Sequence, residues 1–293
     1  MNQLIADYTF MQNTTWRLKA QYPMLQVKTI GKSVVGRSIY GLEIGRESAP
    51  CTLFVGTLWG TDNQSGPLLL QFAESLLKGI ANGSSVSGVN PLTILSKQKI
   101  VLIPFANPDG REICARGAHC AGLDSGRIRR LCHSHTAKWS ANARGVDIGR
   151  NFDFGFAPRR KREQGCGIFG PAAFGYSGPT AESEPETVAI ADYCRQQKTI
   201  HTVAFYPGSG EVYWRNNREE SEHNRQAGQL IALAAGYATE AEFGALTDSG
   251  FRNWSAAALN CPSVDIMFRS SVEGYTLYQE LAELLVTACL VHQ

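Results

Sequence analysis

Short apolar runs alternate with amphipathic stretches along the chain, and this pattern predicts a layered α/β fold. Residues 52–55 and 100–104 are continuous apolar runs, which is typical of strands covered on both faces. Residues Ser38–Ile44 alternate between apolar and polar positions, so we expect a strand that is buried on one face only. The other short strands that we expect lie at residues 27–31, 201–205 and 264–268.

Helical periodicity marks several of the segments between these strands. Pro67 suits the first turn of a helix, and Pro23 would end the first helix of the chain. Before another helix, Ser183 is expected to be the cap and Glu186 to complete a capping box. The helices that we expect therefore lie at residues 7–22, 67–80, 183–197 and 275–291.

The middle of the chain has a different composition. Asn107-Pro108-Asp109-Gly110 is a turn signal, and residues 111–174 are rich in Gly, Arg and Cys. We expect that region to be irregular and loop-dominated, as functional loops on a rigid scaffold often are. No repeat or linker divides the sequence, so residues 1–293 are expected to form a single domain.

Composition and charge exclude several classes of protein. The chain has 293 residues, of which 43% are hydrophobic, and its 28 Lys and Arg against 26 Asp and Glu leave a net charge of +2. A nucleic-acid binder would normally have a larger basic excess, so we expect no nucleic-acid partner. No apolar run is long enough for a membrane span and the first residues lack a secretory signal, so we expect a cytoplasmic protein of undetermined oligomeric state.

Four motifs, in this order along the chain, resemble those of the zinc carboxypeptidases: GKSVVGRSI at 31–39, NPDG at 107–110, GVDIGRNF at 145–152 and SEPET at 183–187. Tyr22-Pro23, WSAN at 139–142 and GEVYW at 210–214 resemble most the bacterial γ-D-glutamyl-diaminopimelate peptidases of that family, which trim murein peptides. The resemblance implies a mixed, mostly parallel eight-stranded sheet flanked by helices. It also implies an active site at the carboxyl ends of the strands.

The zinc positions of the family are altered in this chain. The family binds zinc through His-x-x-Glu after the second inner strand and through a later histidine, and the resemblance places Trp59, Asp62 and Tyr206 there. An indole nitrogen is a donor only, and a neutral phenol is a poor ligand. Three altered ligands cannot hold zinc in the usual way, so we expect no metal in the cleft, although zinc is the cofactor of active members.

The general base of the family is altered as well. Met267 stands where the resemblance places the catalytic glutamate, and a thioether cannot move a proton. Without zinc and without a base worth about 10²–10⁴ in rate, the chain is predicted to have lost metal-dependent peptidase activity. We therefore expect no catalytic residue except one candidate, Asp265, which lies two positions earlier and faces the same side of the strand.

Part of the substrate-binding equipment of the family is present. Arg150 matches the arginine that grips a substrate carboxylate, but Gly149 replaces the asparagine before it, and Ser140 replaces a further arginine after Trp139. Arg150 either contacts a murein-type peptide or another carboxylate ligand, or is a solvent-facing or salt-bridged residue. Trp59 is expected to fill the former metal position and to contact the ring at position 206.

Two other functions are consistent with these residues. The chain could be an active peptidase or amidase with non-standard machinery around Asp62, Asp265 and Tyr206, or an interaction partner or regulator of an active relative. Remodelled packing and hydrogen bonding would explain the same polar groups without catalysis.

A second candidate site lies outside the cleft, in a segment crowded with cysteine and histidine. These residue types suit structural zinc, but their spacing matches no common zinc motif, and free thiols, a Cys120–Cys132 disulfide or a flexible loop are the alternatives. The candidate ligands are Cys114, His119, Cys120, Cys132, His133 and His135. Two nearby basic runs, at 127–130 and 159–162, are typical of solvated loops and could also attract an acidic peptide or partner.

Overall fold

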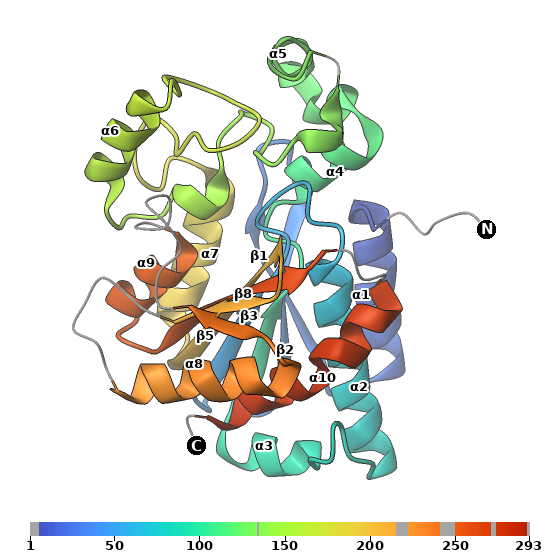
Figure 1. The fold of residues 1–293 in the computed structure, drawn as a ribbon. Helices are drawn as coiled ribbons and strands as arrows, with labels where there is room; N and C mark the ends of the chain where they lie inside the picture. Colours follow the sequence, from blue (N-terminus) through green and yellow to red (C-terminus); the bar gives the residue numbers. More distant parts are fainter. Residues whose placement is uncertain (1–5, 134, 215–221, 241–249, 271–273, 292–293) are drawn as a thin grey trace.

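A mixed eight-stranded sheet forms the centre of the molecule, with the strand order β1-β2-β4-β3-β5-β8-β6-β7 (Figure 1). The computed structural model describes residues 6–133, 135–214, 222–240, 250–270 and 274–291. The strands are β1 (Gln26–Lys32), β2 (Ser38–Ile44), β3 (Cys51–Val55), β4 (Lys99–Ile103), β5 (Thr199–Gly208), β6 (Glu211–Tyr213), β7 (Ala238–Glu240) and β8 (Ser263–Arg269).

The inner strands β4, β3, β5 and β8 run parallel to one another, whereas β1, β2 and the β6–β8 pair are antiparallel. The predicted mixed, mostly parallel eight-stranded sheet is therefore confirmed. The helices are α1 (Tyr8–Gln21), α2 (Ser65–Asn82), α3 (Pro91–Lys97), α4 (Pro108–Arg116), α5 (Ser125–Leu131), α6 (Phe156–Gly165), α7 (Pro185–Gln196), α8 (Glu222–Ala235), α9 (Phe251–Ala258) and α10 (Gly274–Leu290). Across the described residues, we find no helix with the length and apolar character needed to cross a bilayer.

Helices cover both faces of the sheet, because successive side chains of a strand point to opposite faces. Phe54 of β3 packs into a core that it shares with α1, α2, α8 and α10. Its neighbours Leu53 and Val55 pack on the other face, with α7 and α9. The predicted burial of β3 and β4 on both faces is thus confirmed, since every residue of these two strands is buried.

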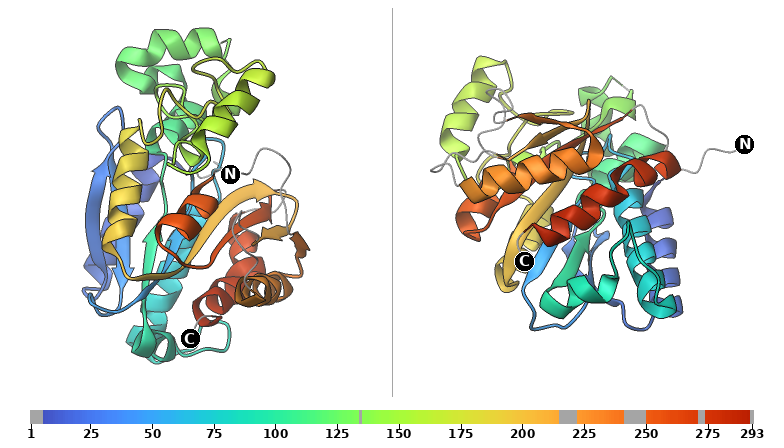
Figure 2. Two further views of the ribbon diagram at one scale, coloured as in Figure 1. Left: turned by 90° about the vertical axis from the view of Figure 1, so that its left-hand side faces the viewer. Right: turned by 60° about the horizontal axis from the view of Figure 1, so that its bottom comes forward.

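Residues 111–174, which we call the cap, lie together at one end of the sheet (Figures 1 and 2). The expectation of a loop-dominated region is wrong, because the cap contains the end of α4, the helices α5 and α6, and three short 3₁₀ segments. Its own small apolar core includes Ile113, Ile128 and Trp139. The expected turn at 107–110 is the start of α4, where the Asn107 side chain accepts a hydrogen bond from the Gly110 N–H.

The strand β2 is buried on both faces, which corrects the expectation of a half-exposed strand. Glu43, one of the polar positions in its alternating pattern, is buried because it has three partners, of which Lys28 lies at 3.0 Å. The Lys99 ammonium lies 2.8 Å from one carboxylate oxygen of Glu43, and the Tyr193 hydroxyl donates to the other at 2.6 Å. The alternating pattern predicts that Glu43 is exposed. Its pairing with these partners makes its burial possible instead.

The helix α7 begins without the predicted capping box. Its Glu186 carboxylate accepts hydrogen bonds from the Val34 N–H and the Asn142 amide instead of from its own helix end. The Ser183 hydroxyl donates to Glu184 and does not cap the helix. Tertiary partners from the cap and from the β1–β2 turn therefore replace the local motif that the sequence predicted.

Candidate functional site

Trp59, Tyr206 and Met267 come together at the ends of neighbouring strands. Trp59 follows β3, while Tyr206 of β5 and Met267 of β8 are paired directly in the parallel register. The ring centroids of Trp59 and Tyr206 lie 4.9 Å apart, so the predicted contact between them is confirmed. These residues, with Arg150, Arg252 and Asp265, are the candidate site.

The cap covers Trp59 from the other side. The ring of Phe174 lies edge-on to Trp59 at 5.4 Å, and the Arg150 guanidinium lies over the Phe174 ring at 5.1 Å. Gly149 lies beside the indole as well: a Cβ atom at that position would be in ordinary van der Waals contact with Nε1 of Trp59, at 3.9 Å. Trp59 thus contacts two aromatic rings, and its neighbours on the cap are Phe174 and Gly149.

Asp62 lies outside this cluster, fully buried at the start of α2. One of its carboxylate oxygens accepts hydrogen bonds from the N–H groups of Gln64 and Ser65, at 3.0 and 2.9 Å, and the other accepts from the Ser65 hydroxyl. Burial raises the pKa of Asp62, while the bonds from Ser65 and the charge of Arg111 oppose the shift. Both oxygens are engaged, so Asp62 orders the chain that leads into α2.

Arg150 is buried and salt-bridged. Its Nε lies 3.2 Å from Oδ2 of Asp147, and the Gly175 N–H donates to the same oxygen. Burial raises the pKa of Asp147, whereas Arg150 lowers it. Beneath this pair the buried Arg159 donates to the Arg150 carbonyl oxygen, and burial together with the charge of Arg150 lowers the pKa of Arg159 to about 9. Asp147 therefore holds Arg150 in place beside Phe174.

Arg252 of α9 is a member of the candidate site that the sequence prediction missed. Its Nε lies 3.3 Å from Oδ2 of Asp265, yet Nε and Nη1 of Arg252 and Oδ1 of Asp265 are buried without a hydrogen-bond partner among the described residues. Burial raises the pKa of Asp265 to about 6, although Arg252 opposes the shift. The one signal in the sequence that could have indicated this buried charge is the position of Arg252 between two large apolar residues, Phe251 and Trp254.

Tyr206 lies among these charges. Burial, followed by the nearby carboxylates of Asp265 and Asp147, raises the pKa of Tyr206 well above its usual value, so its phenol stays protonated. Two guanidinium groups and two carboxylates thus surround a neutral phenol and an indole. Chemically, such a set can bind a carboxylate or a zwitterionic group, because guanidinium forks suit carboxylates and the aspartates suit cations.

The cysteines and histidines of the cap make mostly local contacts. None of the eight cysteines forms a disulfide in this structure, so Cys120 and Cys132 are not bridged. Cys120 Sγ lies 3.5 Å from Nε2 of the adjacent His119, and Cys114 donates to the Ala137 carbonyl. Cys132 donates to the Arg129 carbonyl, and His135 Nδ1 lies 2.8 Å from the His133 carbonyl oxygen.

Within the described part of the chain, no three His, Cys, Asp or Glu side chains lie close enough together to hold a metal ion. The metal site in the cap therefore stays a prediction. His292 and the side chain of His223 lie outside what the structure describes.

Residues 11–270 match the zinc carboxypeptidase family, and the chain belongs to this family. It is 24% identical over 285 residues to γ-D-glutamyl-L-diamino acid endopeptidase 1 of Lysinibacillus sphaericus, covering 94% of this chain and 69% of that protein. The chain spans less than two thirds of the length of several other curated relatives.

Solved structures of the same family have the same fold. Carboxypeptidase A from Helicoverpa armigera superimposes with a TM-score of 0.73 at 18% identity, over 98% of this chain and 73% of that one. Murein-tripeptide amidase MpaA from Escherichia coli O157 does so with a TM-score of 0.54 at 17% identity, over 91% and 92% of the two chains. The predicted family and fold class are confirmed.

Proposed function

We propose that this protein is a zinc carboxypeptidase-family member that does not bind zinc at the position used by the family, and that its candidate site binds murein-type peptides or other ligands with a carboxylate. The observation that carries the proposal is the position of Trp59, in contact with the rings of Tyr206 and Phe174. In members that bind it, zinc lowers the pKa of a bound water to roughly 7 for attack on an amide.

The residues of this chain do not fit such a zinc ion. A catalytic zinc site needs about three protein ligands with free lone pairs. The indole of Trp59 has none to offer, and the high pKa of Tyr206 keeps its phenol protonated. The carboxylate of Asp62 is already occupied by Gln64 and Ser65. Met267, beside Tyr206 in the register, cannot accept a proton from a water.

Carboxylate binding is supported by the two arginines. Arg150 is held by Asp147 and stacked on Phe174, so its guanidinium is ordered before a ligand arrives. Arg252 is ion-paired with Asp265 through Nε, but its buried Nη1 has no hydrogen-bond partner among the described residues, a condition that native proteins rarely tolerate and that a ligand carboxylate would relieve. The name of the Lysinibacillus relative points to γ-D-glutamyl-L-diamino acid peptides as the first ligands to test.

Elemental analysis and calorimetry test this proposal together. We expect purified protein to contain far less than stoichiometric zinc, to bind a γ-D-glutamyl-diaminopimelate peptide, and to leave that peptide uncut. Replacing the peptide carboxylates by amides, or Arg150 or Arg252 by Gln, should weaken binding about tenfold or more. The matched control is Arg17→Gln, which removes an exposed arginine far along the chain from the site. Stoichiometric zinc at these residues, with cleavage of the peptide, would overturn the proposal.

A second candidate function is metal-independent hydrolysis with Asp265 as the acid or base. The pKa of Asp265, raised to about 6, and its unpartnered Oδ1 favour it, because a general base works best near the ambient pH. Turnover of a peptide library that disappears in Asp265→Asn would support this function. Absence of turnover with every added metal and peptide would exclude it and leave binding alone.

A further inference from the structure

Charge is divided unevenly between the cap and the rest of the molecule. Residues 111–174 contain twelve Lys and Arg against five Asp and Glu, a net charge of +7. The remaining residues contain sixteen Lys and Arg against twenty-one Asp and Glu, a net charge of −5. The small net charge of the whole chain therefore conceals a cationic end and an anionic remainder, which differ in the partners that they attract.

Burial increases this contrast at the surface of the cap. Three of its five acidic residues, Glu112, Asp147 and Glu163, are buried, whereas Asp124 is half-buried and Asp153 is exposed. Asp147 and Glu163 pair with Arg150 and Arg160 inside the cap. The buried carboxylates thus neutralise arginines within the cap, and only two acidic side chains remain at its surface against several exposed cations.

The exposed basic residues have few acidic neighbours. Arg127 pairs with Asp124 at 3.4 Å, but in the part of the chain that the structure describes no carboxylate pairs with four other exposed cations. These four are Arg129, Arg130, Lys138 and Lys161. Ile128 is the buried residue of α5, so this short helix directs its arginines outward. Unpaired cations on one end of a protein attract anionic partners over a Debye length of about 8 Å at physiological salt.

Large apolar side chains are exposed on the same cap, and Leu123 and Phe169 are exposed more than Phe174. Leu123, just before α5, is fully exposed at 107%, and Phe169, just after α6, is 73% exposed. Arginine and exposed aromatic or aliphatic side chains are the residue types that protein interfaces favour. The cap therefore combines long-range attraction for anions with apolar anchors for side chains.

We propose that the exposed side of α5, with Leu123 just before it and Arg129 and Arg130 within it, is a docking surface for an acidic peptide segment of a partner protein. An acidic segment complements the positive charge of the cap, and an apolar side chain of that segment would contact the exposed Leu123. A long nucleic acid fits less well, because it would run past the cap onto the anionic remainder of the molecule. The surface is distinct from the candidate site, which lies beneath Phe174.

Fluorescence anisotropy with the full chain tests the surface. The probe is a fluorescein-labelled Glu-rich peptide with one central leucine, measured at low and at physiological salt. We expect the affinity for the peptide to weaken steeply with salt and to fall about tenfold in the double variant Arg129→Gln/Arg130→Gln. Both substituted side chains are exposed, so the midpoint of unfolding should not change. The matched control is Lys78→Gln/Lys97→Gln, two exposed lysines of α2 and α3, and α3 lies at the opposite end of the molecule (Figure 1).

Three results would overturn the inference. One is no binding of the acidic peptide, and another is an equal loss of affinity in the control variant. The third is tighter binding of a single-stranded oligonucleotide of the same charge, which would assign the surface to nucleic acid. Arg150→Gln should leave the acidic peptide bound. If that variant alone releases it, the peptide occupies the candidate site, so the docking surface is wrong while the proposed function stands.

Discussion

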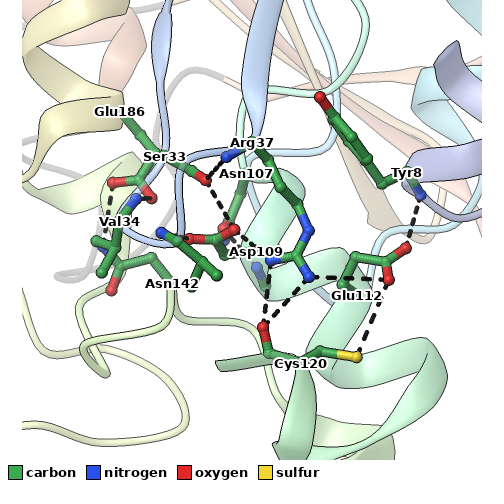
Figure 3. A network of polar contacts seen from close by, with 12 residues as sticks. Tyr8, Ser33, Val34, Arg37, Asn107, Asp109, Glu112, Cys120, Asn142 and Glu186 are labelled. Carbon is green, nitrogen blue, oxygen red and sulfur yellow. Dashed lines mark hydrogen bonds and ion pairs between the residues drawn. The ribbon is translucent and has the colours of Figure 1, made fainter. Parts of the chain in front are cut away.

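Two buried polar regions of the molecule differ in how completely their hydrogen bonds are satisfied. The first is the network that ties the cap to the sheet, centred on Asp109 (Figure 3). The carboxylate of Asp109 accepts from the Ser33 hydroxyl at 2.7 Å, from the Val35 N–H at 2.9 Å and from the Arg37 guanidinium at 2.6 Å. Arg37 also reaches the Cys120 carbonyl of the cap.

The second region is the candidate site, where buried atoms lack partners. Oδ1 of Asp147, Oδ1 of Asp265 and two nitrogens of Arg252 have no hydrogen bond among the described residues. Buried polar groups in native proteins are nearly always bonded, so exceptions call for an explanation such as a ligand. Asp109 is thus hydrogen-bonded through both carboxylate oxygens. Polar atoms of the candidate site, and of Asp147 beside it, lack hydrogen bonds among the described residues.

The largest predicted effect is the loss of Asp109. Asp109→Ala leaves the Arg37 guanidinium, the Ser33 hydroxyl and a backbone N–H without their shared acceptor, so we expect a loss of about 3–5 kcal/mol in the free energy of unfolding. Urea unfolding followed by circular dichroism measures it. The control is Glu74→Ala, which breaks the exposed Arg17 pair and should cost less than about 1 kcal/mol. Equal losses in the two variants would mean that the network contributes no more than a surface pair.

Glu186 should make stability depend on pH within the same network. Burial, with a further contribution from Asp109, raises its pKa from 4.5 to about 7. The native state therefore keeps a proton that the unfolded state loses, and stability should fall as pH rises from about 4.5 to about 7, by a total on the order of 3 kcal/mol.

The Glu186→Gln variant lacks this titration, so its stability relative to wild type should rise by that amount across the same window. Urea unfolding at a series of pH values measures the difference. Glu74→Gln is the control, because the bond from Arg17 lowers the pKa of Glu74 and places its titration below the window. A difference between Glu186→Gln and wild type that is constant with pH would contradict the prediction.

The inner strands were predictable because their residues face apolar neighbours on both sides. The runs that became β3 and β4 contain few polar positions that could suggest another structure. By contrast, β6 and β7 have three residues each, too few for a pattern to be seen. The burial of β2 depended on Glu43 finding Lys99 and Tyr193, which no local pattern encodes.

The candidate site was predictable only in part. Trp59 and Tyr206 could be placed together because they follow or end neighbouring strands in a family register. Arg252 was missed because its short helix α9 was not predicted, and its partner Asp265 lies on another element. The partners of Asp62 could not be predicted, because its carboxylate accepts hydrogen bonds from Gln64 and Ser65, and the direction of a side chain is not encoded in a family motif.

Within the candidate site, Trp59 and Gly149 should be energetically coupled. The amide of an asparagine at position 149 would meet the indole of Trp59, because even its Cβ would lie 3.9 Å from Nε1. We expect Gly149→Asn to destabilise the protein by about 1–2 kcal/mol, and to do so much less when Trp59 is replaced by His. A double-mutant cycle should give a coupling energy of about 1 kcal/mol.

The control for this cycle is Gly165→Asn combined with the same replacement of Trp59, since a Cβ at position 165 meets nothing within 4 Å. Its coupling to Trp59 should be close to zero. If Gly149 and Trp59 were uncoupled as well, the two departures from the family pattern would be independent of each other. The packing of the Trp59 indole would then not require a glycine at position 149.

The smallest predicted effect separates Asp62 from the candidate site. Asp62→Asn keeps an oxygen that can accept the N–H groups of Gln64 and Ser65, and Asn serves this role about as well as Asp, so the free energy of unfolding should change by less than about 1 kcal/mol. Asp62→Ala leaves those groups unpaired and should cost about 1–2 kcal/mol more. Calorimetry should find carboxylate-peptide binding unchanged in Asp62→Asn, in contrast to Arg252→Gln. If Asp62→Asn abolished binding or any turnover, this carboxylate would act on the ligand. Asp62 would then belong to the candidate site and not to the hydrogen-bonded scaffold.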